Sequence, residues 1–277
     1  MPVDVDLISY NIASSLKTSF GVKISESTEK YMKNISKKIS KQSSDNKLYY
    51  ANYGMKLAKN LTDYLDGISF FEINDDPEHE VTHDFKLTWK KDNVSYISLS
   101  FSSVQVKDII PEKLMKICKY RKNTKISMYY TSGYKKYSEY GYQKIKNTER
   151  YSELDAAIKQ QYIIDPMCEL VVSTLSKKRK CANILYNYLF TESDRIVFKL
   201  HKNRFMMYDF SKELEEVTSY RIKINASKNI VITFNNGTIF ELSLRTNASE
   251  IKEHLSIKFR TCFSNMDDLY VISYDKV

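Results

Sequence analysis

Over residues 1–66, apolar residues recur every three or four positions, which predicts helices. In the segment NKLYYANYGMKLAKNLTDYLDG, five apolar residues share one helical face: Ala51, Met55, Ala58, Leu61 and Leu65. The start of SESTEKYMKNISKKISK, with Ser and Thr followed by Glu, is typical of a capping box and predicts an earlier helix. Asp66-Gly67 is typical of a helix end.

The pattern then changes to alternation with a period of two, which predicts strands. In VTHDFKLTW, residues 81–89, Asp84 and Lys86 share the face opposite the apolar residues; in VSYISLSF, residues 94–101, Ser98 and Ser100 do the same. KKDN between them is typical of a turn. Folding the hairpin about residues 91 and 92 brings Asp84 level with positions near 99. We therefore expect a polar face centred on Asp84, Ser98 and Ser100.

Residues 107–150 are basic and rich in tyrosine, with twelve Lys or Arg, four Asp or Glu, and seven Tyr. Lysines such as Lys135 and Lys136 can neutralise phosphates, and tyrosines can stack on bases. The alternative is a solvated loop or helix whose tyrosines pack inward. Further on, NIVITFNNGTIFELSLR predicts a hairpin, because Gly237 permits the positive φ of a tight turn.

These patterns predict one α+β domain over residues 1–277, with a central mixed β-sheet flanked by helices. Residues 1–66 are expected to be mainly helical, 67–150 to hold the hairpin core and the basic Tyr/Lys-rich segment, 151–190 to be helical and 191–277 to be strand-rich.

The amino-acid composition indicates which class of partner the protein could bind. The net charge of +9 favours a polyanionic partner such as nucleic acid, although such a charge also serves solubility alone. No apolar stretch reaches the ~20 residues of a membrane span, and MPVDVDLISYNIASS lacks the features of a secretion signal. The four cysteines have no CxxC spacing, which argues against a zinc site. We expect a protein without a membrane partner that is intracellular (cytoplasmic, or associated with a nucleoid or virion), with reduced thiols.

Three stretches resemble the HaeIII-type (GGCC-cutting) type II restriction endonucleases, a PD-(D/E)xK family, in the same order from about residue 45 onward. FNNGTIFELSLRTNASEIKEHLSIKF matches the signature SFRIHNAS followed by SLKFD at Arg245, Asn247, Ala248, Ser249 and Lys258. ILYNYLFTESDRIVFKL is similar to the family's leucine-rich helix and strand, and ISLSFSSVQVKDIIPEKL lines up with ISIKHN…AVKHSRLS. The resemblance implies a restriction-endonuclease-like fold, a double-stranded DNA partner, Mg²⁺ as the cofactor of an active enzyme, and a possible homodimer.

The departures from the family pattern concern its chemistry. Asp84 matches the first catalytic aspartate, but Ser100 stands where the family has its lysine, and Ser98 replaces the acid on that strand. Metal and lysine charges stabilise the transition state of phosphodiester cleavage, and a neutral hydroxyl replaces neither. The resemblance therefore implies a degenerate site made of Asp84, Lys86, Ser98 and Ser100, with cleavage lost or weak.

Three functions stay open. The first is a DNA-binding protein derived from a restriction endonuclease, with contacts from Lys107, Lys135, Lys136, Arg245, Asn247, Ser249 and Lys258. The second is an active Mg²⁺-dependent endonuclease, in which Asp84 and Glu80 hold the metal and Lys86 supplies the cation. The third is a structural or assembly protein, for instance of a viral particle, that reuses the fold for protein contacts.

Overall fold

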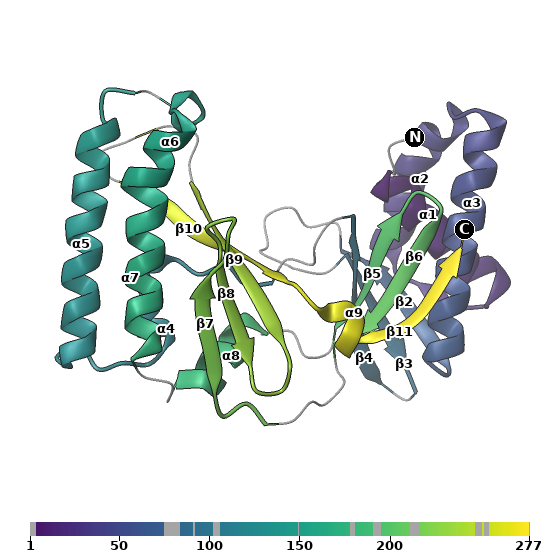
Figure 1. Cartoon of the computed structure of the whole chain (residues 1–277). Coiled ribbons are helices and arrows are strands. Elements are labelled where there is room, and N and C mark those ends of the chain that lie inside the picture. The colour runs from purple at the N-terminus through teal and green to yellow at the C-terminus, as the bar shows by residue number, and fades with distance from the viewer. Residues whose placement is uncertain are drawn as a thin grey trace. The chain divides into compact units, whose positions relative to one another are not determined.

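The computed structural model describes residues 4–74, 84–90, 92–101, 106–148, 150–177, 181–190, 195–210, 216–246, 251 and 255–276. The chain divides into two compact units (Figure 1). The first unit comprises Met1–Ser102, Glu192–Glu213 and Tyr270–Val277, and the second comprises Ser103–Thr191 and Leu214–Leu269. Each unit combines helices with its own β-sheet, which confirms the α+β class. A single restriction-endonuclease-like domain stays a prediction.

The first unit contains a seven-stranded mixed sheet in the order β1-β2-β3-β4-β5-β6-β11. The pairs β1–β2 and β4–β5 are parallel, and the other neighbours are antiparallel. The strands are β1 (Lys23–Ile24), β2 (Ile68–Ile73), β3 (Phe85–Trp89), β4 (Asn93–Ser100), β5 (Arg195–His201), β6 (Arg204–Asp209) and β11 (Val271–Lys276). The β3–β4 hairpin is the one predicted from alternation, and positive φ angles at Lys90 and Asp92 form its turn.

The N-terminal region is mainly helical, as predicted. Its helices are α1 (Val5–Ser19), α2 (Glu26–Ser40) and α3 (Ser44–Tyr64), and strand β1 lies between α1 and α2. The side chains of Asp4, Ser25 and Ser43 cap their N-termini. Buried residues of α1 and α3 form one apolar core with buried residues of β2 to β6. Gly54 permits a close approach of the two helices, since a Cβ atom there would lie 2.4 Å from the Asn11 side chain.

The second unit contains an antiparallel four-stranded sheet in the order β10-β9-β8-β7. The strands are β7 (Tyr220–Ile224), β8 (Ile230–Phe234), β9 (Ile239–Thr246) and β10 (Ile257–Phe263). Its β8–β9 turn has Gly237 at φ +86°, as the sequence predicts. Apolar residues of the inner face pack against helices: Tyr186 contacts Phe234 and Phe240, and the Tyr220 hydroxyl donates to the Leu175 carbonyl at 2.9 Å.

The helices of this unit are α4 (Leu114–Ile117), α5 (Lys125–Ile145), α6 (Ala156–Lys159), α7 (Asp165–Ser176), α8 (Ala182–Leu189) and α9 (Met266–Leu269). Short 3-10 turns at Pro111–Lys113 and Tyr151–Glu153 and a π-helical segment at Gln160–Ile164 complete it. The basic Tyr/Lys-rich segment therefore folds mainly as α5, which packs against α7. Among the described residues, no helix combines the length and apolar character that crossing a membrane requires.

Candidate functional site

Asp84 lies where the β3–β4 ladder ends. Its backbone N–H donates to the Ile97 carbonyl at 2.8 Å, and its carboxylate oxygen Oδ2 accepts a hydrogen bond from the Leu99 N–H. Its carbonyl accepts from Asn74 N–H at 2.9 Å. The side chain thus takes the place of a backbone acceptor for β4. Asp84 lies close to residue 99 of β4, as the folding of the hairpin predicts. Holding the end of the hairpin is therefore one function of this carboxylate.

The two serines of the expected site lie on β4, next to β5. Ser98 is paired with Val197 and is 3% exposed, and Ser100 is paired with Lys199 and is half-buried. Paired residues of parallel strands point to the same face of a sheet. Lys199 thus lies beside Ser100, the position that the sequence resemblance aligns with the nuclease lysine, but it belongs to the neighbouring strand. Lys199 was not among the site residues expected from the sequence, because alternation within one strand does not reveal which strand will be its neighbour.

Lys86 lies on the other side of β4, paired with Tyr96 across β3–β4 and with Glu72 across β2–β3. By strand geometry, the Cα atom of Lys86 is about 7 Å from the Cα atom of Asp84. The Cα atom of Lys199 is about 12 Å from the Cα atom of Asp84. Of these two lysines, Lys86 is therefore the better placed to act with Asp84. Glu80, the expected second metal ligand, lies outside the described residues. Within the described ranges, no three His, Cys, Asp or Glu side chains are grouped to hold a metal ion.

Two of the expected DNA contacts meet in the second unit. Arg245 on β9 is directly paired with Lys258 on β10, and both point away from the apolar inner face. Arg245 is exposed and Lys258 is half-buried. Asn247 and Ser249 lie outside the described residues. The candidates for catalysis and the candidates for DNA contact thus belong to different units.

Three further cations share this outward face: Arg221 and Lys223 on β7 and Arg260 on β10, all exposed. We refer to Arg221, Lys223, Arg245, Lys258 and Arg260 as the basic sheet face. Arg221, Lys223 and Arg260 were not among the residues expected from the sequence, although SYRIKI and SIKFRTCF alternate cationic with apolar residues and so indicate a cationic strand face.

One carboxylate, Glu241, lies within the four strands β7 to β10. It accepts hydrogen bonds from the side-chain amides of Asn225 at 2.9 Å and Asn229 at 2.8 Å. The five aromatic residues of these strands, in contrast, are all buried: Tyr220, Phe234, Phe240, Phe259 and Phe263. The outward face is therefore cationic and polar, and its strands offer no aromatic ring for stacking.

Beside β10, the segment that precedes α4 adds one negative charge, at Asp108, and one positive charge, at Lys107. The Asp108 carboxylate lies 2.7 Å from the Lys258 ammonium and also accepts from the Thr261 N–H at 3.3 Å. Lys107 is exposed, and its ammonium lies 4.9 Å from the centre of the Tyr188 ring. Asp108 thus partly neutralises Lys258, whereas Lys107 remains an exposed cation.

Helix α5 carries Lys135 and Lys136, both exposed. We expected the tyrosines of this segment either to be accessible for stacking or to pack inward, and α5 contains both kinds. Tyr130 is buried, and its hydroxyl donates to the Pro111 carbonyl at 2.8 Å, whereas Tyr129 is half-exposed with the Lys177 ammonium 4.3 Å from its ring centre. Some of these tyrosine rings therefore pack in the core, and others are accessible to solvent.

Comparison with known proteins finds a viral relative of this chain. No protein-family model matches the chain, and no solved structure matches it. A mimivirus protein, "Uncharacterized protein R607" of Acanthamoeba polyphaga mimivirus, is 34% identical over 293 aligned positions, which cover 98% of each chain. Identity at this level over nearly the full length of both proteins shows common descent. The chain therefore belongs to the same family as the mimivirus protein R607.

Proposed function

We propose that this protein binds double-stranded DNA through the basic sheet face and that it has little or no nuclease activity. The observation that carries the proposal is the grouping of five cations on one outward face whose only strand carboxylate, Glu241, is already bound by two asparagines. Such a surface neutralises phosphates and releases their counterions, which supplies most of the affinity for nucleic acid.

The arrangement of these cations favours a duplex. Arg221 and Lys223 lie on one outer strand and Lys258 and Arg260 on the other, three strand spacings or about 14 Å apart. That separation is close to the ~12 Å width of the major groove, so the two sets of cations can face the two phosphate backbones. Proteins that bind single strands usually rely on exposed aromatic rings, which this face does not provide.

Two further parts of the proposal rest on the sequence resemblance. Descent from HaeIII-type nucleases is supported by the match at Arg245 and Lys258, and loss of cleavage by Ser100 at the lysine position. None of the four cysteines, all of which lie within the described residues, forms a disulfide bond, which supports an intracellular location. Contacts from Lys107, Lys135 and Lys136, and assembly as a homodimer, belong to the same proposal.

A metal-dependent endonuclease is the second candidate. The observation that favours it is the placement of Lys86 and Lys199 on the two strands beside β4, on the same face as Ser98 and Ser100. A lysine from a neighbouring strand would then supply the positive charge that Ser100 lacks.

Anisotropy titration of a labelled duplex tests the first proposal. The double variant Arg245→Gln/Arg260→Gln should weaken binding at least about tenfold, whereas Lys37→Gln/Lys41→Gln, an equal charge change in the first unit, should have a much smaller effect. Equal effects of the two variants would show that total charge alone drives binding. No binding at low salt, together with a stable oligomer, would favour the structural or assembly function.

A further inference from the structure

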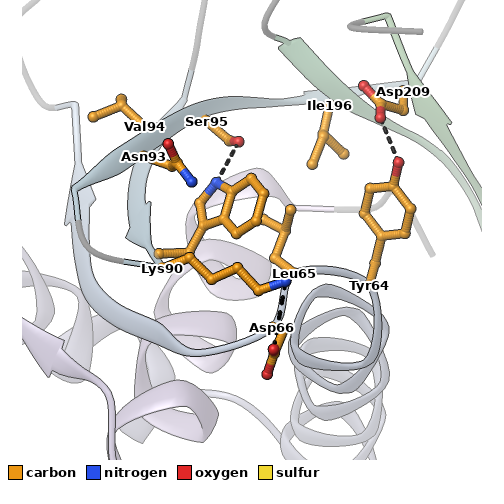
Figure 2. A pocket seen from close by; sticks show the side chains of 10 residues that line it. Tyr64, Leu65, Asp66, Lys90, Asn93, Val94, Ser95, Ile196 and Asp209 are labelled. Atoms are coloured by element: carbon orange, nitrogen blue, oxygen red, sulfur yellow. Dashed lines mark hydrogen bonds and ion pairs between the residues drawn. The ribbon is translucent and has the colours of Figure 1, made fainter.

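The first unit has a cavity of about 620 Å³ beside the C-terminal end of α3 and the β3–β4 hairpin (Figure 2). Its lining includes the carboxylates of Asp66 and Asp209, the rings of Tyr64 and Trp89, and the apolar side chains of Leu65 and Ile196. The backbone carbonyls at a helix C-terminus carry partial negative charge. The two carboxylates and this helix end therefore make the cavity attractive to cations.

Trp89 supplies a fixed aromatic face. Its indole N–H donates to the Ser95 hydroxyl at 2.9 Å, which holds the ring in place. The Lys90 ammonium lies 5.8 Å from the ring centre and 3.5 Å from the Asp66 carboxylate. The side chains of Lys90 and Asp66 are 55% and 84% exposed, so this ion pair contributes little and is easily displaced. The protein's own ammonium thus shows which chemical group this end of the cavity accepts.

The second carboxylate lies at the other end of the group of side chains drawn in Figure 2. Asp209 accepts a hydrogen bond from the Tyr64 hydroxyl. Burial, and secondarily the hydrogen bond to Asp209, raises the pKa of Tyr64 to about 12, so the phenol remains a donor at neutral pH. Leu65 and Ile196 are buried and offer an apolar wall.

We propose that this cavity binds a small aliphatic diamine. One ammonium group pairs with Asp209, and the other replaces the Lys90 ammonium between Trp89 and Asp66. The methylene chain contacts Leu65 and Ile196. Each carboxylate offers a partner to one ammonium group, the indole adds a cation–π contact, and the apolar lining residues give the methylene chain an apolar contact. The proposal is independent of DNA binding, because every residue that carries it lies in the first unit.

Trp89 is the single tryptophan of the chain, so its fluorescence reports on the cavity directly. The protein is titrated without DNA with 1,4-diaminobutane, butylamine and 1,4-butanediol. The diamine should give a saturable fluorescence change and bind more tightly than butylamine, by up to about fivefold, because its second ammonium group adds an ion pair at an exposed carboxylate, which is worth up to about 1 kcal/mol. The uncharged diol should give no saturable change. Absence of saturable binding of the diamine, or equal binding of diamine and diol, would overturn the proposal.

A matched pair of variants locates the binding. Asp209→Asn should weaken diamine binding about tenfold, since it removes one charge and keeps the shape. Asp63→Asn makes the same charge change on an exposed α3 residue outside the cavity lining and should leave binding unchanged. Equal weakening by both variants would show that the diamine responds only to the total charge of the protein. That result would refute a specific binding site in the cavity. If Asp209→Asn fails to fold by circular dichroism, Asp66→Asn replaces it, with the same two outcomes.

Discussion

The Asp84 carboxylate accepts a hydrogen bond from the Leu99 backbone N–H, beside the Phe85–Ile97 pair of the β3–β4 ladder. This contact ties the residue that matches a catalytic aspartate to the integrity of its own hairpin. A carboxylate used in this way is less available to a metal ion. If the protein does not cut DNA, as we propose, this hydrogen bond gives Asp84 a structural function that does not depend on cleavage.

Replacing Asp84 tests its structural function. Asp84→Ala leaves the part-buried Leu99 N–H without this acceptor and should lower the free energy of unfolding by about 1–3 kcal/mol. Asp84→Asn keeps an acceptor oxygen and should cost less. Urea unfolding followed by the fluorescence of Trp89, on the same hairpin, measures both. Equal stability of Asp84→Ala and wild type would show that the hydrogen bond contributes nothing.

We expect no metal-dependent cleavage of plasmid DNA by the wild-type protein in Mg²⁺ or Mn²⁺. The physical reason is that Ser100 supplies no ammonium group at the lysine position. Agarose-gel assays over several hours measure residual nicking. Cleavage that disappears in Asp84→Asn and in Lys86→Gln or Lys199→Gln, but persists in the control Asp275→Asn, would establish the endonuclease alternative.

Removal of the Asp108 charge should strengthen DNA binding. Asp108→Asn keeps an acceptor oxygen for the Thr261 N–H but no longer neutralises Lys258, whose ammonium lies 2.7 Å from the native carboxylate. The dependence of log K on log salt should become steeper by about 0.9, the value for one additional phosphate contact. Duplex titrations at four salt concentrations measure it. An unchanged slope would place Lys258 outside the DNA contact.

The pKa of Tyr64 predicts a pH dependence of stability. Because the pKa is raised to about 12 in the folded protein, above its ordinary value of 10.0, the folded state holds this proton more strongly. The contribution of the hydroxyl is therefore constant below about pH 10 and is lost as the pH rises from 10 towards 12. The difference in unfolding free energy between wild type and Tyr64→Phe should follow this course. A difference that stays constant to pH 12 would contradict the raised pKa.

Local sequence patterns predict much of this fold. Alternation located the β3–β4 hairpin and its turn, three- and four-residue spacing located α3, and Asn-Asn-Gly located the turn at Gly237. These features depend on residues close together in the sequence, which is why periodicity reveals them.

The rest depends on contacts between distant segments. β4 pairs with β5 although almost a hundred residues separate them, and most of the intervening chain belongs to the second unit. No periodicity indicates that Ser100 will lie beside Lys199, or that Arg221 will share a face with Arg260. The cavity likewise combines Tyr64, Trp89 and Asp209 from three separate segments.

The salt dependence of duplex binding tests the central claim most directly. If the basic sheet face contacts phosphates, log K for a labelled duplex should fall with log salt with a slope of about −3 to −4, which corresponds to about four neutralised phosphates. In Arg245→Gln/Arg260→Gln, the slope should become shallower by about 2, whereas Lys37→Gln/Lys41→Gln should retain the wild-type slope. A wild-type protein that shows no duplex binding at low salt, or a slope that the Arg245→Gln/Arg260→Gln change leaves intact, would contradict the account.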